Sequence, residues 1–354
     1  MLKRNPIASN LIALPAQPAD VPWPDAEWPV GRLDGHVDQD RFDALTGAAF
    51  DDPPSGRLGE THALLIVQNG RIVFEKYDAA HDVASSLPSW SEAKSITHAL
   101  IGILVREGKI DIHKPADVPE WQGEDDPRRA ITLDHLLRMS SGLAFKEEYE
   151  PDNPSDVIEM LFGSGQKDVA AFAADFPLTH EPGDYWSYAS GTTNIIARFA
   201  GQIIGGGAQG FHDFMKRELF SPIGMASPIP KFDEAGTFIG SSYCFCTARD
   251  FARFGTLYLR DGEWNKRRLL PEGWVDYART PTPQPDEDDS ALGYGAQWWL
   301  GIAGPHSFSA NGYEGQYTVL VPELDLVLVR HGASEAVKDN VRDWIGEVVD
   351  CFRG

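Results

Sequence analysis

Apolar residues cluster in short runs near both ends of the chain and recur at helical spacing in between. The apolar stretch 64–74 is interrupted by Asn69-Gly70, a pair that favours a tight turn with positive φ, so the pattern predicts a β-hairpin. Residues 317–330 carry two further apolar runs around a Pro-Glu-Leu-Asp turn and predict a second hairpin. The strand signals therefore lie at the two ends of the chain.

Helical periodicity covers much of the remaining sequence. One apolar helix is predicted to begin near Ser91 and to end before Gly108, a residue that favours a helix terminus. Thr132 is a capping residue ahead of another apolar stretch. The helices predicted in this way cover residues 39–50, 91–107, 132–139, 194–204 and 335–352.

Strands at both ends and helices between them predict an α/β fold of the α+β type, in which an antiparallel sheet is flanked by helices and an all-helical lobe is inserted. We expect residues 59–110 and 241–354 to form the α/β lobe and residues 111–240 the helical lobe, with a cleft between them. Residues 1–58 are rich in proline, and their two tryptophans favour an arm that packs on the body.

The charge balance narrows the classes of partner. The 354 residues include 53 acidic and 31 basic side chains, which gives a net charge of −22. Such a surface repels phosphate and anionic lipid, so neither a nucleic acid nor a membrane is expected as a partner. No run approaches the roughly 18 consecutive apolar residues of a membrane span, and no secretory signal follows Met1, so we expect a cytoplasmic protein. The oligomeric state is left open.

No cofactor or metal is expected from the motifs. Three cysteines cannot form a disulfide framework, which favours a reducing compartment. Cys244 and Cys246 alternate as on a strand, but a structural zinc site needs about four ligands. The glycine-rich run 205–210 follows a helix instead of a strand, so it lacks the context of a dinucleotide-binding loop.

Two Ser-x-x-Lys patterns are candidates for nucleophilic chemistry. Ser164 and Lys167 lie in a glycine-flanked stretch without helical periodicity, which would not hold their geometry. Ser91 and Lys94 open an apolar helix, where positions i and i+3 share one face. A serine hydroxyl needs a base. Lysine serves near pH 7 if burial or a nearby cation lowers its pKa by roughly three units, or if a partner relays the proton. On spacing alone, a capping serine with a surface lysine is the more common arrangement.

A tyrosine could complete such a site. Tyr188 lies in the run Trp-Ser-Tyr-Ala-Ser-Gly over 186–191. A phenol can carry protons between a nucleophile and a leaving group when a cation lowers its pKa. Taken alone, this sequence pattern is more typical of an ordinary half-buried tyrosine without a catalytic role.

Together these segments resemble the serine β-lactamase-like hydrolases, which include class C β-lactamases, D-alanyl-D-alanine peptidases, esterases and the 6-aminohexanoate-dimer hydrolases. The last branch is the most similar. The likeness runs in order over roughly residues 60–350. It is carried by the segments 90–95, 131–143, 182–191, 247–254, 269–274 and 311–316.

The resemblance implies a two-lobed fold and a role for each matching residue. It implies Ser91 as nucleophile, Lys94 as its base or proton relay, and Tyr188 as the proton shuttle to the leaving group. The oxyanion hole would be made by the backbone N–H groups of Ser91 and Tyr313. Residues that would line the substrate pocket are Ser190, Trp186, Gly312, Trp298 and Tyr294.

Two departures from the family pattern bear on the substrate. The lactamases have Tyr-x-Asn where this chain has Tyr188-Ala-Ser190, and a hydroxyl lacks the paired donor and acceptor of an amide. The third motif, Lys-Thr-Gly or His-x-Gly in the family, falls near Asn311-Gly312, where no lysine is present to hold a substrate carboxylate.

We therefore expect a serine hydrolase for a small ester or linear amide. A β-lactamase or D-Ala-D-Ala peptidase, and a non-catalytic ligand-binding protein on the same fold, are the alternatives.

Overall fold

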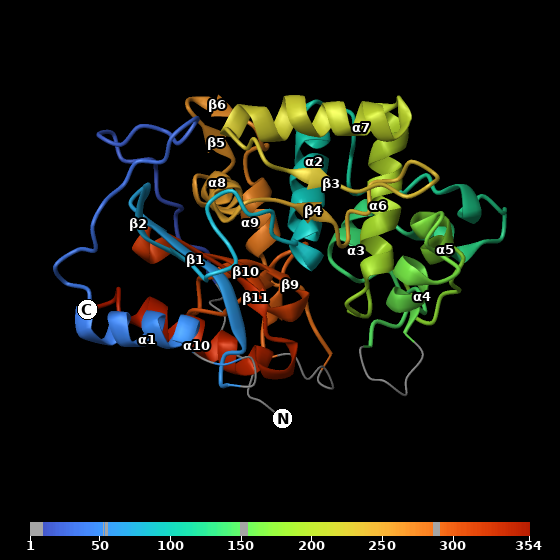
Figure 1. Ribbon diagram of the computed structural model, residues 1–354. Helices are drawn as coiled ribbons and strands as arrows, with labels where there is room; N and C mark the ends of the chain where they lie inside the picture. The colour runs from blue at the N-terminus through green and yellow to red at the C-terminus, as the bar shows by residue number, and fades with distance from the viewer. Residues whose placement is uncertain (1–9, 52, 54–55, 149–154, 286–290) are drawn as a thin grey trace.

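The computed structural model describes residues 10–51, 53, 56–148, 155–285 and 291–354. Its main element is a seven-stranded sheet in the order β2-β1-β11-β10-β9-β8-β7, in which neighbouring strands are antiparallel (Figure 1). One pairing in this sheet joins an early strand, β1, to the last strand, β11. The strands are β1 (Glu60–Gln68), β2 (Arg71–Tyr77), β7 (Gly293–Tyr294), β8 (Trp299–Leu300), β9 (Phe308–Gly312), β10 (Gln316–Val321) and β11 (Leu326–Ala333).

Both predicted hairpins are confirmed. Asn69 and Gly70 take φ values of 50° and 71° between β1 and β2, as a primed turn requires. The turn between β10 and β11 ends at Asp325, whose φ of 46° is also left-handed. The antiparallel sheet predicted from the two ends of the chain is therefore present.

Helices cover both faces of this sheet. Leu64 and Ile66 of β1 belong to a core shared with Trp344 of α10, whereas Leu65 and Val67 belong to the core of the other face. Alternate residues of a strand point to opposite faces, and here both faces are apolar. One face is covered by α1 (Gln39–Asp51) and α10 (Lys338–Asp350), and the other by α8 (Ala248–Leu259) and α2 (Ala93–Arg106) (Figure 1).

A helical region lies beside α2, on the right in Figure 1. Its long helix, α6, packs against α2, α3, α5 and α7. The region also holds β3 (Ile229–Pro230), which pairs with β4 (Cys244–Phe245), so residues 111–240 are not helical throughout. The helices are α3 (Leu133–Leu137), α4 (Asp156–Phe162), α5 (Val169–Ala174), α6 (Ser190–Ile204) and α7 (Gly207–Met215).

The segment that precedes α1 lies along α8 and the small hairpin β5 (Glu263–Trp264) and β6 (Arg267–Arg268). The buried Arg253 guanidinium donates to the backbone oxygen of Pro24 at 2.8 Å and to that of Ala26 at 3.0 Å. Trp28, which is 5% exposed, donates from its indole to the Arg249 oxygen at 3.3 Å. Buried donors are therefore satisfied by this proline-rich segment. Among the described residues, no helix has both the length and the apolar character needed to cross a membrane.

Candidate active site

Ser91 lies in the short 3₁₀ turn Trp90–Glu92 that leads into α2. Trp90 takes a left-handed φ of 42°, which is strained for a bulky residue. Its indole donates to Glu314 Oε2 at 3.2 Å and its ring packs edge-on against Tyr313, so contacts across the site hold it there. The backbone thus presents Ser91 at the start of the helix, opposite the end of β9.

The side chain of Lys94 is buried, with 2% exposure, and its Nζ donates three hydrogen bonds. The acceptors are Ser91 Oγ at 2.9 Å, Ser190 Oγ at 2.8 Å and the Ser241 backbone oxygen at 3.0 Å. Burial lowers the pKa of Lys94 to about 8, while the charge of Glu147 acts in the opposite direction. Lys94 is therefore placed to exchange a proton with Ser91 near neutral pH.

Tyr188 precedes α6 and lies next to both groups. Its ring centroid is 4.9 Å from Lys94 Nζ. Burial, followed by the charge of Glu147, raises the pKa of Tyr188 well above its usual value, although hydrogen bonds with Ser91 and Trp299 act to lower it. The phenol is thus protonated at neutral pH, and the lowering of its pKa by a cation that we considered from the sequence is wrong.

Glu147 belongs to the same cluster but was not identified from the sequence. Ser190 Oγ donates to Glu147 Oε1 at 2.9 Å, and the Ser190 N–H donates to Glu147 Oε2. A half-buried carboxylate therefore fixes the hydroxyl that accepts from Lys94. Since Glu147 precedes Ser190 by 43 positions, no local spacing could have connected the two.

A pocket of about 180 Å³ opens in front of Ser91. The end of β9 forms one wall, where Gly312 approaches the Ser89 backbone so closely that a Cβ would overlap the Ser89 oxygen. Asn311 is 9% exposed, and within the described part of the chain neither atom of its amide has a hydrogen-bond partner. The lining residues are Ser91, Tyr188, Trp299, Asn311, Gly312, Tyr313, Gly315, Tyr317, Glu335, Lys338 and Arg342.

The predicted pocket residues separate into three groups. Gly312 lines the pocket and Ser190 contacts Lys94, as described above. Trp186 and Tyr294 pack behind Tyr188 and Trp299 and so support the wall. The prediction for Trp298 is wrong, because its ring is fully buried between Tyr258 and Phe308 in the core. Its neighbour Trp299 faces the pocket instead, as expected for consecutive residues of extended chain.

Comparisons with known proteins agree with this arrangement. A family model described as Beta-lactamase matches residues 59–345. The 6-aminohexanoate-dimer hydrolase of Paenarthrobacter ureafaciens is 25% identical over 312 residues, covering 82% of this chain and 77% of that protein.

Solved structures support the fold. A Bacillus anthracis protein named as a candidate 6-aminohexanoate-dimer hydrolase superposes with a TM-score of 0.73 at 22% identity, over 96% of this chain and 90% of that one. A penicillin-binding protein homologue from Caulobacter crescentus superposes with a TM-score of 0.66 at 16% identity, over 91% of this chain and 99% of that one.

Proposed function

Because the chain belongs to the beta-lactamase family, we propose that it is a serine hydrolase that cleaves a small ester or a linear amide through an acyl-enzyme on Ser91. The observation that carries the proposal is the buried amine of Lys94 at 2.9 Å from Ser91 Oγ. A hydroxyl becomes an effective nucleophile when a neighbouring base takes its proton as the new bond forms. The lowered pKa of Lys94 supplies that base at a pH not far above neutral.

In the acylation step, neutral Lys94 takes the hydroxyl proton while Ser91 Oγ attacks the substrate carbonyl. The backbone N–H groups of Ser91 and Tyr313 are proposed to hold the oxyanion, since both residues line the pocket. Tyr188, which keeps its proton at rest, donates it to the leaving oxygen or nitrogen and is reprotonated from Lys94. Water then attacks the acyl-enzyme by the reverse proton path.

Ser190 and Glu147 are proposed to position the amine. Lys94 Nζ has three acceptors when charged, and Ser190 is held in place by Glu147. Once Lys94 loses a proton, its lone pair can accept from only one of the three groups. The Ser241 carbonyl cannot donate and the Ser190 hydroxyl is committed to Glu147, so the lone pair is directed to Ser91.

The pocket favours esters and linear amides over β-lactams. The strand β9 reads Phe-Ser-Ala-Asn-Gly and carries no cation in the place of the family's lysine. Lys338 and Arg342 do line the pocket, but they are paired with Glu335 and Asp339. The relative from Paenarthrobacter ureafaciens is named for a linear amide, which supports the same substrate class. The buried, unpaired amide of Asn311 can offer a donor and an acceptor to such a group.

The proposal is tested with a panel of p-nitrophenyl esters, linear amides and nitrocefin, together with mass spectrometry after a fluorophosphonate probe. We expect turnover of esters or amides and one adduct on Ser91. Ser91→Ala should lower kcat/KM by at least about 10³-fold. Ser164→Ala is the matched control, because it removes the serine of the second, exposed Ser-x-x-Lys pattern and should leave the rate unchanged.

Three results would argue for other readings. Nitrocefin turnover that rivals the esters would favour a β-lactamase. An absence of both adduct and turnover would favour a ligand-binding protein. An adduct on a different serine would overturn the role of Ser91.

We also propose a cytoplasmic location. The three cysteines, all within the described residues, are buried and not in disulfides, which supports a reducing compartment.

A further inference from the structure

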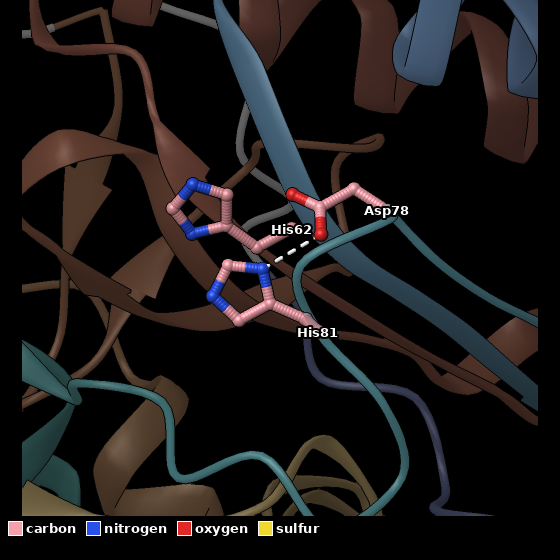
Figure 2. Close-up of side chains that lie close together, drawn as sticks. All are labelled: His62, Asp78 and His81. Atoms are coloured by element: carbon pink, nitrogen blue, oxygen red, sulfur yellow. Dashed lines mark hydrogen bonds and ion pairs between the residues drawn. The ribbon is translucent and has the colours of Figure 1, made fainter.

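Two histidines and an aspartate meet where β1 begins and where the segment after β2 begins (Figure 2). One ligand atom from each of His62, Asp78 and His81 lies within 4.8 Å of the others. His81 Nδ1 is 2.7 Å from Asp78 Oδ1, and the two imidazole rings stack with centroids 4.4 Å apart. None of these three residues lines the Ser91 pocket, so the cluster is separate from the proposed hydrolase chemistry.

A break in the sheet register directs His62 into this cluster. Thr61 pairs with Gly332 and Ala63 pairs with His331, so His62 is the extra residue of a β-bulge. A bulge leaves one residue out of the ladder and changes the direction of its side chain. Bulges are common beside functional sites, and this one places an imidazole at a strand end that regular pairing would have aimed elsewhere.

The backbone also fixes the carboxylate. The Asp78 N–H donates to the His62 oxygen at 3.1 Å, which keeps the two residues adjacent after β2 has ended. Asp78 Oδ1 accepts from the Ala80 N–H at 2.8 Å, the pattern of a turn closed by an aspartate side chain. The carboxylate is therefore oriented by the chain itself.

Glu60 adds a second carboxylate next to the first histidine. Its Oε2 lies 3.3 Å from His62 Nε2. Histidines that bind metals usually contact a carboxylate or carbonyl through the ring nitrogen that does not bind the ion, and this contact fixes the tautomer and the ring orientation. Glu60 is placed to do this for His62.

The donor set and its exposure suit a transition-metal ion. Two imidazoles and one carboxylate are ligands that Zn²⁺ and its neighbours prefer, whereas Mg²⁺ and Ca²⁺ prefer oxygen alone. The side chains of His62, Asp78 and His81 are 20%, 28% and 27% exposed, so they are largely removed from water yet reachable from solution. We propose that these three residues bind a divalent ion of the zinc class, with Glu60 orienting His62.

Such an ion would tie β1 to the segment 78–81. That segment continues along the chain toward the Trp90–Glu92 turn that presents Ser91. The site is therefore structural: it stabilises the folded chain because the ion binds the folded state better than the unfolded one. The three ligands span 20 positions without a compact motif, which is why no metal was expected from the sequence.

The test uses the full, tag-free chain stripped with EDTA and titrated with Zn²⁺ by calorimetry and with Co²⁺ by visible absorption. We expect one equivalent to bind and the Co²⁺ bands to be those of a low-coordinate nitrogen and oxygen site. His62→Ala, His81→Ala and Asp78→Asn should each weaken binding by at least about tenfold, and Glu60→Gln by about tenfold or less. His36→Ala is the matched control, because His36 contacts Asp34 at 3.0 Å on the exposed surface.

Circular dichroism and thermal unfolding in EDTA establish that each variant is folded before its affinity is compared. The proposal is overturned if wild type takes up no ion, or if His62→Ala and His81→Ala bind Zn²⁺ as tightly as wild type. Ester hydrolysis by wild type should be unaffected by EDTA at a temperature well below unfolding. Complete loss of hydrolysis on metal removal, with the fold retained, would overturn the structural role assigned to the ion. Failure of the hydrolase proposal would leave the binding results unchanged.

Discussion

At the scale of single residues, the protonation of Lys94 decides how the proposed activity depends on pH. Burial holds its pKa at about 8 instead of 10.5. Below pH 8 the amine is charged and cannot accept the Ser91 proton, so kcat/KM should fall about tenfold per pH unit on the acid side. The raised pKa of Tyr188 means that this residue adds no alkaline limb near neutral pH. An ester assay from pH 5.5 to 9.5 measures the profile, and a flat profile would contradict the role of Lys94.

Glu147 should set the pH at which kcat/KM begins to fall on the acid side, which is called the acid limb of the profile below. Its negative charge favours charged Lys94, so Glu147→Gln removes a force that raises the lysine pKa. We expect the limb to move to lower pH by on the order of one unit. Glu148→Gln, a change at the adjacent exposed glutamate, should leave the limb in place. Loss of rate in Glu147→Gln without any movement of the limb would mean that Glu147 acts only through Ser190.

The residues that sequence reasoning identified and those it missed differ in how they are connected. Ser91 and Lys94 lie one helical turn apart, and they were identified once the resemblance to the serine β-lactamase-like hydrolases was added to that spacing. The structure places their side chains 2.9 Å apart. Glu147 reaches this pair only through Ser190 and the tertiary fold, and no local pattern reports such a contact. The prediction of Trp298 as a pocket residue failed because the face that a residue of extended chain presents depends on pairing partners far away in the sequence.

At the scale of elements, the close packing of α2 against α9 (Trp274–Arg279) limits which substitutions α2 tolerates. A Cβ on Gly102 would overlap the Trp274 indole, whose nitrogen donates to the His98 oxygen at 3.2 Å. Overpacking costs about 1–3 kcal/mol, more than the roughly 1 kcal/mol that alanine gains over glycine in a helix. Gly102→Ala should therefore lower the free energy of unfolding.

Gly201 in α6 is the matched control for this prediction. No atom outside its own helix lies within 4 Å of a Cβ built there. Gly201→Ala should then show only the higher helix propensity of alanine, which should raise the free energy of unfolding by up to about 1 kcal/mol. Urea unfolding followed by circular dichroism compares the two variants with wild type. A shift of the same sign in both would show that packing on Trp274 does not control the outcome.

Elements were predictable where their signal is local. The two hairpins and α2 follow from turn residues and apolar periodicity within a few positions. The two-residue strands β3, β7 and β8 carry no such signal, because their pairing partners decide whether so short a segment is a strand. The sequence also predicts a solvated loop at the acidic run 286–289, and this run lies outside the described residues.

At the scale of the whole molecule, the topology brings the two ends of the chain into one sheet and leaves the helical region beside it. The site draws Ser91 from the Trp90–Glu92 turn, Lys94 from α2, Ser190 from α6, and Gly312 from the end of β9. Opposite charges are also gathered near the pocket, where Lys338 and Arg342 stand, each beside an acidic partner, in a chain of net charge −22.

That charge leads to a last prediction about stability. Like charges repel more strongly in the compact state than in the expanded unfolded chain, so the folded protein is destabilised when screening is weak. Raising the ionic strength from 0.01 to 0.15 M shortens the Debye length from about 30 Å to about 8 Å and should raise the thermal midpoint by about 1–3 °C. Near the sequence pI of about 4.7 the net repulsion disappears, so the same salt step should produce no gain there. Scans in dilute buffer at both pH values measure the effect. A salt gain of equal size at pH 7 and at pH 4.7 would show that net charge is not its cause, because only the repulsive part depends on pH in this way.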